Sequence, residues 1–439
     1  LGLNKVPIRD NFVKQHPKLL SGGVWSIITL GYQPSDEKDE LPWTIEKLKP
    51  IQISGIDIDE YKEVRKQFSK EEWIDLLMHS IGLNPEEFSD RSKMLQLTRL
   101  VPFAEKNYNL IELGPKGTGK SHLYSELSPH GILISGGEVS KAKLFVNNST
   151  GEIGLVGYWD VVAYDEFAGK TKKADRGLVD ILKNYMANKS FSRGVETISA
   201  EASMVFVGNT DNTVSHMLEH DHLFSPLPAN YIDSAFLDRI HCYVPGWESD
   251  MIRREMFSAG FGFVVDFFAG VLKSLRDQDL SYLIDEHFRL SSSITTRDAE
   301  GIRRTFSGLF KLVFPDGQAT EVEIEELLQI AIEGRRRVKD QLLRLDPTIS
   351  EVEFTYADST GVEHEVVCQE QVDYPQYYDL RPSFNNGADE GESVNDYDAS
   401  AISDLVSGAT EVSIRVATLE DEKSLNILKN LVLQLCENL

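Results

Sequence analysis

The sequence predicts an α/β fold in which helices cover a parallel sheet and a helical lid follows. Three observations lead to this prediction. A glycine-rich turn at 114–121 joins an apolar strand pattern at 110–113 to a helical pattern. Strand and helix patterns then alternate to about residue 250, as in parallel sheets covered by helices. Beyond that point the pattern is helical, which predicts the lid.

Further elements are expected on either side of this core. Apolar runs at 25–30 and 43–48 predict strands, and Ser69-Lys-Glu-Glu72 is a capping-box pattern that opens a helix. An amphipathic pattern predicts one long helix over Glu321–Leu345. We expect a β-rich element at 1–54, a helical segment at 55–107, the α/β core at 108–250, the lid at 251–345, a β-hairpin module at 346–382, an acidic linker at 383–399 and a small strand–helix element at 400–439.

Composition restricts the class of protein. With 439 residues, 41 % of them apolar, the chain can form several globular cores. No apolar run approaches the eighteen or so residues that a membrane-spanning helix needs, so no membrane segment is expected. Cys242, Cys368 and Cys436 form no C-x-x-C pair, which argues against a disulfide framework or structural zinc and favours a reducing cytoplasm.

The net charge of −25 is concentrated near the end of the chain. From Asp346 onward there are 20 acidic and 4 basic residues, a net charge of −16. An acidic total argues only weakly against nucleic-acid binding, because local basic patches decide that question.

The turn at 114–121 carries the strongest functional signal. It fits G-x-x-x-x-G-K-[ST], in which backbone N–H groups cradle nucleotide phosphates. Lys120 is expected to reach the β- and γ-phosphates, and the Ser121 hydroxyl to hold Mg²⁺. The alternative, a glycine-rich surface turn, is disfavoured by the flanking strand and helix. The sequence thus predicts a site for ATP and Mg²⁺ at Gly114, Pro115, Lys116, Gly117, Thr118, Gly119, Lys120, Ser121 and His122.

Two acids end the next strongly apolar strand pattern, at 161–164. In a phosphate-loop ATPase, an aspartate at this place supports Mg²⁺, and a glutamate activates the attacking water. We assign these roles to Asp165 and Glu166. Acids at an exposed strand end are the alternative interpretation.

Three further polar residues resemble the sensor and finger residues of AAA+ ring ATPases. Asn209 ends the apolar strand pattern that begins at Ala202, and the resemblance implies a first sensor that orients water. The segment 233–240 resembles the one that carries an arginine finger, here Arg239, which would act on the nucleotide of a neighbouring subunit. The helix near 295–304 resembles the second-sensor helix, with Thr296 as its N-cap and Arg297 as the sensor.

Simpler interpretations remain open for each of these residues. Asn209 could cap its strand, and Arg239 could form a surface pair with Asp238. Arg303 and Arg304 are also candidates for the second sensor, and each lid arginine could belong to a solvated basic face.

The amino-acid sequences of these motifs resemble one AAA+ family in particular. They are similar to those of the BrxL family, the Lon-protease-like AAA+ proteins of bacterial BREX phage-defence systems. The match extends over about residues 5–356, and the stretches that carry it are 107–122, 134–137, 154–166, 202–209, 236–241, 245–247 and 332–339.

This resemblance implies an ATP-driven, hexameric ring, stacked as a dodecamer, that encloses double-stranded DNA and is related to MCM helicases. Other BREX proteins are implied as partners, and the bacterial cytoplasm as the location. The segment 186–200 would form a hairpin that projects into the ring channel, where Lys189 and Arg193 could contact phosphates. Lys141 and Lys143 form a second candidate contact, and solvated charges are the alternative for both pairs.

The end of the chain departs from the family pattern. Family members typically end in a Lon-like domain with a serine–lysine dyad. Here a hairpin pattern at 352–362 and an acidic linker lead to a short tail without a convincing dyad, so protease activity is not predicted. Two other functions stay open: an unfoldase that serves a protease, and a nucleotide-gated DNA-binding scaffold with little turnover.

Overall fold

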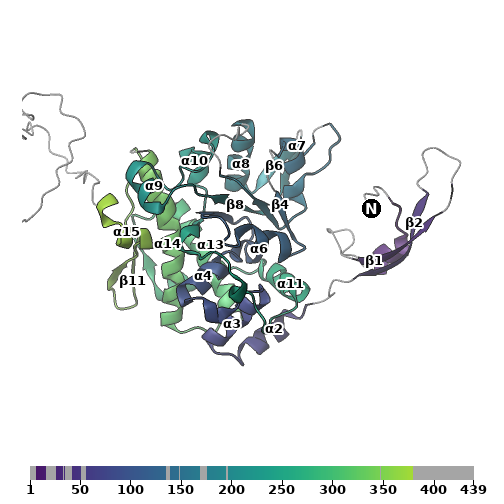
Figure 1. The fold of residues 1–439 in the computed structure, drawn as a ribbon, viewed down its shortest axis with the longest axis horizontal. Helices are drawn as coiled ribbons and strands as arrows, with labels where there is room; N and C mark the ends of the chain where they lie inside the picture. The colour runs from purple at the N-terminus through teal and green to yellow at the C-terminus, as the bar shows by residue number, and fades with distance from the viewer. Residues whose placement is uncertain are drawn as a thin grey trace, which may run out of the picture. The chain divides into compact units, whose positions relative to one another are not determined.

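The computed structural model in Figure 1 describes most of the first 378 residues. The described residues are 6–15, 26–32, 34, 42–50, 56–134, 139–147, 149–168, 176–193, 196–346 and 348–378. The chain divides into two units, Leu1–Leu380 and Arg381–Leu439. The second unit, and with it the predictions for 383–399 and 400–439, lies outside the described residues.

A five-stranded sheet forms the α/β core. Its strands lie in the order β4 (Gly131–Ile134), β5 (Val161–Tyr164), β8 (Ser203–Asn209), β3 (Asn109–Gly114) and β9 (Cys242–Pro245). Every neighbouring pair is parallel, and helices α6 (Lys120–Glu126), α8 (Arg176–Asn188), α9 (Val214–His220) and α10 (Ser234–Leu237) connect the strands. The predicted parallel sheet covered by helices is therefore confirmed.

The order of the strands determines which residues meet. The strand β8 lies between β3 and β5, although it follows both in the sequence. Because the carboxyl ends of parallel strands share one edge of the sheet, the segments after Gly114, Tyr164 and Asn209 emerge together. We call this edge the carboxyl edge, and the opposite one the amino edge.

Helices before and after the sheet pack into one core. The first group is α2 (Ile58–Arg65), α3 (Lys70–Ser80), α4 (Asp90–Thr98) and α5 (Val101–Ala104), and the lid contains α11 (Val265–Leu275), α12 (Leu283–His287), α13 (Thr296–Val313) and α14 (Glu321–Leu345). In Figure 1, α13 and α14 lie side by side, and the buried Trp73 of α3 donates its indole N–H to the Leu312 carbonyl of α13 over 2.9 Å. In the described ranges, none of the helices combines the length and apolarity needed to cross a bilayer.

Helix capping explains two of the boundaries and corrects a third. The predicted capping box of Ser69 and Glu72 is present, and α14 has the predicted bounds, with Thr320 and Glu323 capping its start. The prediction that Thr296 caps its helix was wrong, because Thr295 holds the extended backbone and its hydroxyl accepts the Asp298 N–H over 3.3 Å. Arg297 is therefore the second residue of α13.

Short antiparallel strand pairs lie outside the central sheet. β1 (Ser26–Tyr32) pairs with β2 (Trp43–Pro50), in the element expected to be β-rich, and a helix α1 (Asp10–Gln15) precedes them. β11 (Thr355–Ala357) pairs with β10 (Arg289–Leu290) and β12 (Glu363–Glu365), and α15 (Gln369–Asp373) follows. The hairpin of β6 (Ser190–Arg193) and β7 (Glu196–Ser199) confirms the one predicted within 186–200.

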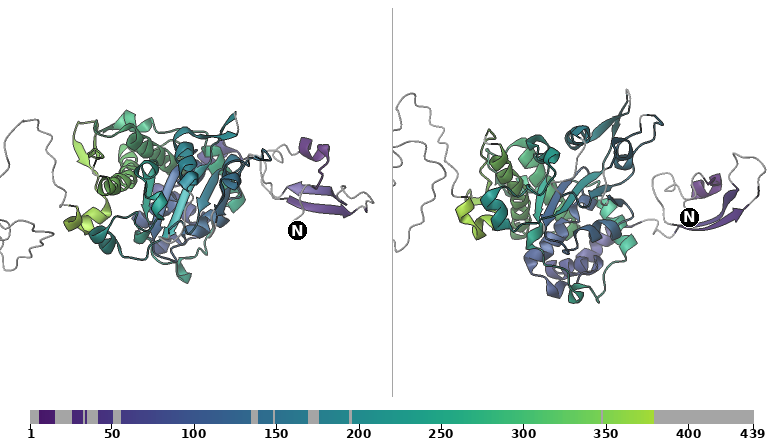
Figure 2. Two further views of the ribbon diagram at one scale, coloured as in Figure 1. Left: turned by 90° about the horizontal axis from the view of Figure 1, so that it is seen from above. Right: turned by 45° about the horizontal axis from the view of Figure 1, so that its top comes forward.

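The β6–β7 hairpin has a neighbour that the sequence did not predict. The short helix α7 (Lys141–Leu144) and the segment after it lie at the same end of the sheet as the hairpin (Figure 2). Phe145, which follows α7, packs on Phe191 of β6 with the ring centroids 5.4 Å apart. The two segments that carry the candidate DNA contacts therefore adjoin each other.

Candidate functional site

The glycine-rich turn joins β3 to α6 and wraps around Lys120. Gly117 and Gly119 have φ angles of +83° and +77°, a conformation that glycine adopts without strain. The Lys120 ammonium donates to the carbonyls of Gly114 and Pro115 over 3.2 Å and 2.5 Å. Burial lowers the pKa of Lys120, although Glu112 counteracts this shift. The loop therefore holds a cation within a ring of backbone groups, as a phosphate-binding loop does.

Close backbone packing requires glycine at the start of this loop. A Cβ atom on Gly114 would lie 2.3 Å from the carbonyl carbon of Gly246, which belongs to the short 3₁₀ helix η5 (Gly246–Glu248). The segment after η5 continues along the loop, and the Ile252 N–H donates to the Gly117 carbonyl over 2.8 Å. Residues 246–252 thus form a wall beside the phosphate loop.

The predicted metal ligands lie next to each other. The Ser121 hydroxyl, at the start of α6, donates to Asp165 Oδ1 over 2.7 Å. Asp165 follows β5, and the same oxygen accepts the Glu166 N–H over 2.8 Å. A hydroxyl and a carboxylate are the oxygen donors that suit Mg²⁺, which usually keeps several waters and binds substrate phosphates. The two residues fit the ion that the phosphate-loop pattern implies.

Glu166 and Asn209 join the same edge of the sheet. Glu166 has a φ of +51°, a conformation that is rare outside glycine and is common at functional sites. Asn209 ends β8 directly opposite Gly114 in the parallel register, and the next N–H, of Thr210, donates to the Gly114 carbonyl over 3.0 Å. The carboxyl edge thus gathers the loop, the metal ligands, the acid and the amide. His122 and Lys116 are exposed beside them.

The two candidate arginines lie elsewhere, at the amino edge. The Asn109 side chain, at the start of β3, donates to the Arg239 carbonyl over 2.9 Å. Arg239 donates from Nη1 to the Ala235 carbonyl, while its Nε is shielded from solvent and has no hydrogen-bond partner among the described residues. Arg297 lies close by and donates to Asp238 Oδ2 over 2.6 Å. The fold brings Arg239 and Arg297 together, away from the phosphate loop of their own chain.

A buried arginine supports this pair, and sequence reasoning did not find it. Arg335 of α14 is fully buried and donates to Asp238 Oδ1 over 2.6 Å and to Asp298 Oδ1 over 2.7 Å. Asp238 therefore bridges Arg335 to the exposed Arg297. The other second-sensor candidates have local partners: Arg303 binds Asp285, and Arg304 binds Glu300 and the Lys106 carbonyl.

The candidate DNA contacts differ in their surroundings. Lys189 precedes the β6–β7 hairpin and lies 3.2 Å from Glu300 Oε1, so its charge is partly neutralised. The side chain of Arg193, in β6, lies outside the described atoms. Lys143 is exposed on α7, and Lys141 is half-buried there. Both of these lysines lie on α7, the segment that adjoins the β6–β7 hairpin.

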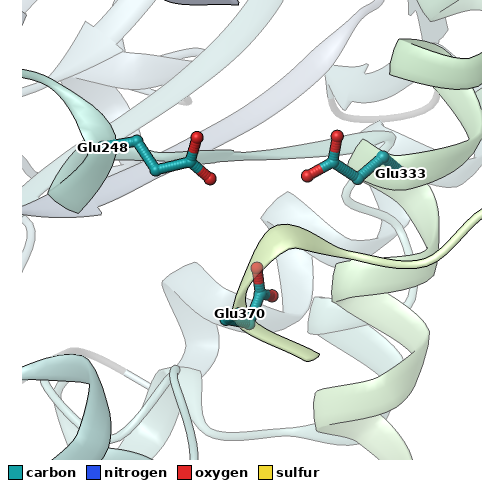
Figure 3. Close-up of side chains that lie close together, drawn as sticks. All are labelled: Glu248, Glu333 and Glu370. Carbon is teal, nitrogen blue, oxygen red and sulfur yellow. The ribbon is translucent and has the colours of Figure 1, made fainter. Parts of the chain in front are cut away.

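Three carboxylates converge on the lid side of the 246–252 wall. Glu248, Glu333 and Glu370 point toward one another, with one oxygen of each within 4.8 Å of the others (Figure 3). Arg91 donates to Glu248 over 2.5 Å and to Glu333 over 2.8 Å, and Arg337 donates to Glu333 over 2.6 Å and to Glu370 over 2.7 Å. Two guanidinium groups thus fill the space between the acids.

The charges of this cluster identify it as an ion network rather than a cation site. Burial alone would raise the pKa of Glu333, but Arg337 and Arg91 outweigh it and lower this pKa to about 2. The network links α4, η5, α14 and α15. It therefore fixes the wall beside the phosphate loop to the long lid helix.

Comparison with known proteins also indicates an ATPase domain. Residues 43–355 match the family model described as "Lon-like protease BrxL-like, ATPase domain". A protein of Bacillus cereus (strain H3081.97) named "Lon-like protease BrxL" is 48 % identical over 370 residues, which are 84 % of this chain and 55 % of the relative. A protein of the same name from Escherichia coli O9:H4 (strain HS) is 44 % identical over 364 residues, 83 % of this chain and 52 % of the relative. The chain spans about half the length of these curated relatives.

Proposed function

The chain belongs to the Lon-like BrxL family through its ATPase domain, and on this premise we propose that it hydrolyses ATP as a ring of AAA+ subunits that binds or encircles double-stranded DNA in bacterial BREX phage defence. The observation that carries the proposal is the 2.7 Å contact between Ser121 Oγ and Asp165 Oδ1 beside the phosphate loop. This pair connects the loop that holds phosphate to the strand end that carries the water-activating acid.

Each residue at the carboxyl edge has a role in phosphoryl transfer to water. Lys120 and the loop N–H groups bind the β- and γ-phosphates, and Mg²⁺ held by Ser121 and Asp165 would neutralise charge on those phosphates. Glu166 accepts a proton from the attacking water, and Asn209 orients that water. Asn209 lies opposite Gly114 in the sheet, and Asp165 and Glu166 follow the strand on the other side of β8, so these groups share one edge.

The amino edge supports a subunit ring. Arg239 and Arg297 are held together there, and Arg239 keeps a shielded Nε without a hydrogen-bond partner among the described residues. Such an arginine suits the charge that develops on a transferred phosphoryl group, since its fork stays protonated and bonds bidentately. In a head-to-tail ring the amino edge of one subunit would face the nucleotide of the next, so the active site would be shared.

The proposal of DNA binding is supported by the neighbouring β6–β7 hairpin and α7 segment. Together they offer Lys141, Lys143, Lys189 and Arg193 at one end of the sheet. In a ring, each subunit would repeat this group, which concentrates positive charge despite the acidic total.

Hydrolysis with and without DNA tests the proposal. We expect the purified chain to release phosphate from ATP, and long double-stranded DNA to raise the rate. Glu166→Gln keeps the size of the side chain but removes the base, so it should lower both rates by roughly 100-fold or more. Hydrolysis that E166Q leaves unchanged would overturn the assigned site, and hydrolysis that ignores DNA would overturn the DNA-dependent part.

A further inference from the structure

We propose that Arg99, which lies behind the phosphate loop in the protein interior, is a positioning residue that turns a loop N–H group outward toward the nucleotide. The inference rests on the proposed ATP site and assigns it a residue that no motif contains. Arg99 lies just after α4 and has only 2 % of its surface exposed.

All five N–H groups of Arg99 have acceptors. Its Nε and Nη2 donate to the two oxygens of Glu112 over 2.9 Å and 2.6 Å, and Glu112 lies fully buried in β3. Nη2 also donates to the Ser249 hydroxyl over 3.2 Å. Nη1 donates to Gln96 Oε1 over 2.5 Å and to the Thr118 carbonyl over 3.3 Å. The guanidinium is therefore fixed in orientation, and one of its donors reaches the loop itself.

The contact with the Thr118 carbonyl determines where the next N–H group points. A peptide unit is planar and trans, so its C=O and N–H bonds point in opposite directions. Since Arg99 draws the Thr118 oxygen toward the interior, the N–H of Gly119 in the same peptide unit faces away from it, on the open side of the loop. Gly119 has a φ of +77°, and the Thr118 hydroxyl accepts a hydrogen bond from Lys120 over 3.2 Å, while Arg99 is the side chain that donates to the Thr118 carbonyl.

A second contact acts on the preceding peptide unit in the same way. The Gly117 carbonyl accepts the Ile252 N–H over 2.8 Å, which holds the peptide unit that contains the Thr118 N–H. The Ser249 hydroxyl, three residues before Ile252, is the one that Arg99 contacts. Arg99 thus holds both the loop and the wall that holds the loop, so the phosphate cradle is formed before the nucleotide arrives.

Arginine suits this position better than lysine. Arg99 binds Glu112 with two parallel bonds and still has a donor left, on Nη1, for the Thr118 carbonyl. A lysine ammonium is a point charge with three donors and cannot span both acceptors with this fork. Arg99→Lys should therefore keep the charge balance with Glu112 but release the Thr118 carbonyl.

The test needs a variant that folds. Replacing Arg99 alone would leave Glu112 buried without its partner, which strongly destabilises a fold. The double variant R99M/E112Q removes both charges with little change in volume. The matched control is K311M/E105Q, which removes another buried ion pair, 2.5 Å long, between α13 and the end of α5.

The readouts are the dissociation constant of a fluorescent ATP analogue with Mg²⁺ and the thermal unfolding temperature. We expect R99M/E112Q and R99K to weaken nucleotide binding by roughly 10-fold or more, because the Gly119 N–H would no longer be held toward the charged phosphates, while K311M/E105Q stays within about 2-fold of wild type. Binding by R99M/E112Q that equals that of the wild type or of the control would overturn this inference alone. A wild-type protein that binds no ATP analogue would overturn the proposed function, and this inference with it.

Discussion

The imidazole of His241 lies in the core at the amino edge, two residues after Arg239. Its Nδ1 accepts the Asn109 N–H over 2.9 Å, and the ring stacks on Tyr108 with the centroids 5.4 Å apart. Burial, with Arg304 nearby, lowers the pKa of His241 from 6.5 to about 3. The folded protein therefore keeps this side chain neutral, as the bond from Asn109 requires.

This pKa predicts acid sensitivity of the fold. Below pH 6.5 the unfolded chain binds a proton at this side chain that the folded chain does not bind until about pH 3, so stability falls as the pH decreases through that window. At about pH 5 the loss from this one group is about 2 kcal/mol. Denaturant unfolding of wild type and His241→Asn at about pH 7.5 and about pH 5 measures it. The variant should lose about 2 kcal/mol less between the two pH values, and an equal loss in both proteins would contradict the assignment.

At the residue scale, contiguous motifs could be predicted and long-range pairs could not. The glycine-rich turn is one unbroken stretch, so its pattern alone was enough to predict roles for Lys120 and Ser121. Arg99 and Arg335 act through acceptors that only the fold brings near. One signal was available for the first of them: Glu112 interrupts an apolar strand pattern, and a buried acid needs a charged partner.

At the scale of elements, the β6–β7 hairpin and α7 adjoin each other and carry candidate DNA contacts. Phe145 and Phe191 join them through an aromatic contact at 5.4 Å. Lys141 and Lys143 lie on α7, and Arg193 pairs with Glu196 in the register of the hairpin. Because the two segments pack together, a DNA backbone that contacts one lies near the other.

Salt dependence tests the candidate contacts on α7 and the hairpin. Each phosphate contact that is lost should reduce the slope of log affinity against log salt concentration by about 0.9 for duplex DNA. We therefore expect K141A/K143A and R193A to weaken duplex binding and flatten its dependence on NaCl between about 50 and 200 mM. Fluorescence anisotropy of a labelled duplex measures both. The matched control K62A/K66A removes Lys62 of α2 and its C-cap residue Lys66, and should keep the wild-type slope. A slope unchanged in the α7 variant would refute the contact.

The elements themselves were predictable where their signal is local. The amphipathic pattern of α14 and the hairpin pattern at 352–362 predicted their elements, since periodicity and turn residues lie within each segment. The β6–β7 hairpin was expected only from the family resemblance. The N-cap of α13 was misplaced by one residue because Thr295 and Thr296 are both good caps, and only the backbone conformation distinguishes them. The strand order, with β8 between β3 and β5, depends on how distant segments pair. Local sequence patterns therefore could not predict it.

At the scale of the whole molecule, the two halves of the proposed active site face away from each other. Asn109 begins β3 beneath Arg239, and Gly114 ends that strand at the phosphate loop. Five steps along a strand cover roughly 17 Å. Arg239 therefore lies far from the phosphate loop of its own chain, and in the proposed ring a second copy of the chain would supply the finger.

Mixing two inactive variants tests this shared site. Glu166→Gln removes the base at the carboxyl edge, and Arg239→Ala removes the finger at the amino edge; each alone should lower hydrolysis, by roughly 1,000-fold or more for the arginine. In mixed rings, an R239A subunit still has Glu166 and can receive Arg239 from an E166Q neighbour. Equal mixing should therefore restore about a quarter of the sites in a head-to-tail ring. The recovered rate should vanish when either variant is replaced by the double variant E166Q/R239A, or when dilution separates the subunits. A mixture no more active than its components would mean that Arg239 does not complete a neighbour's site.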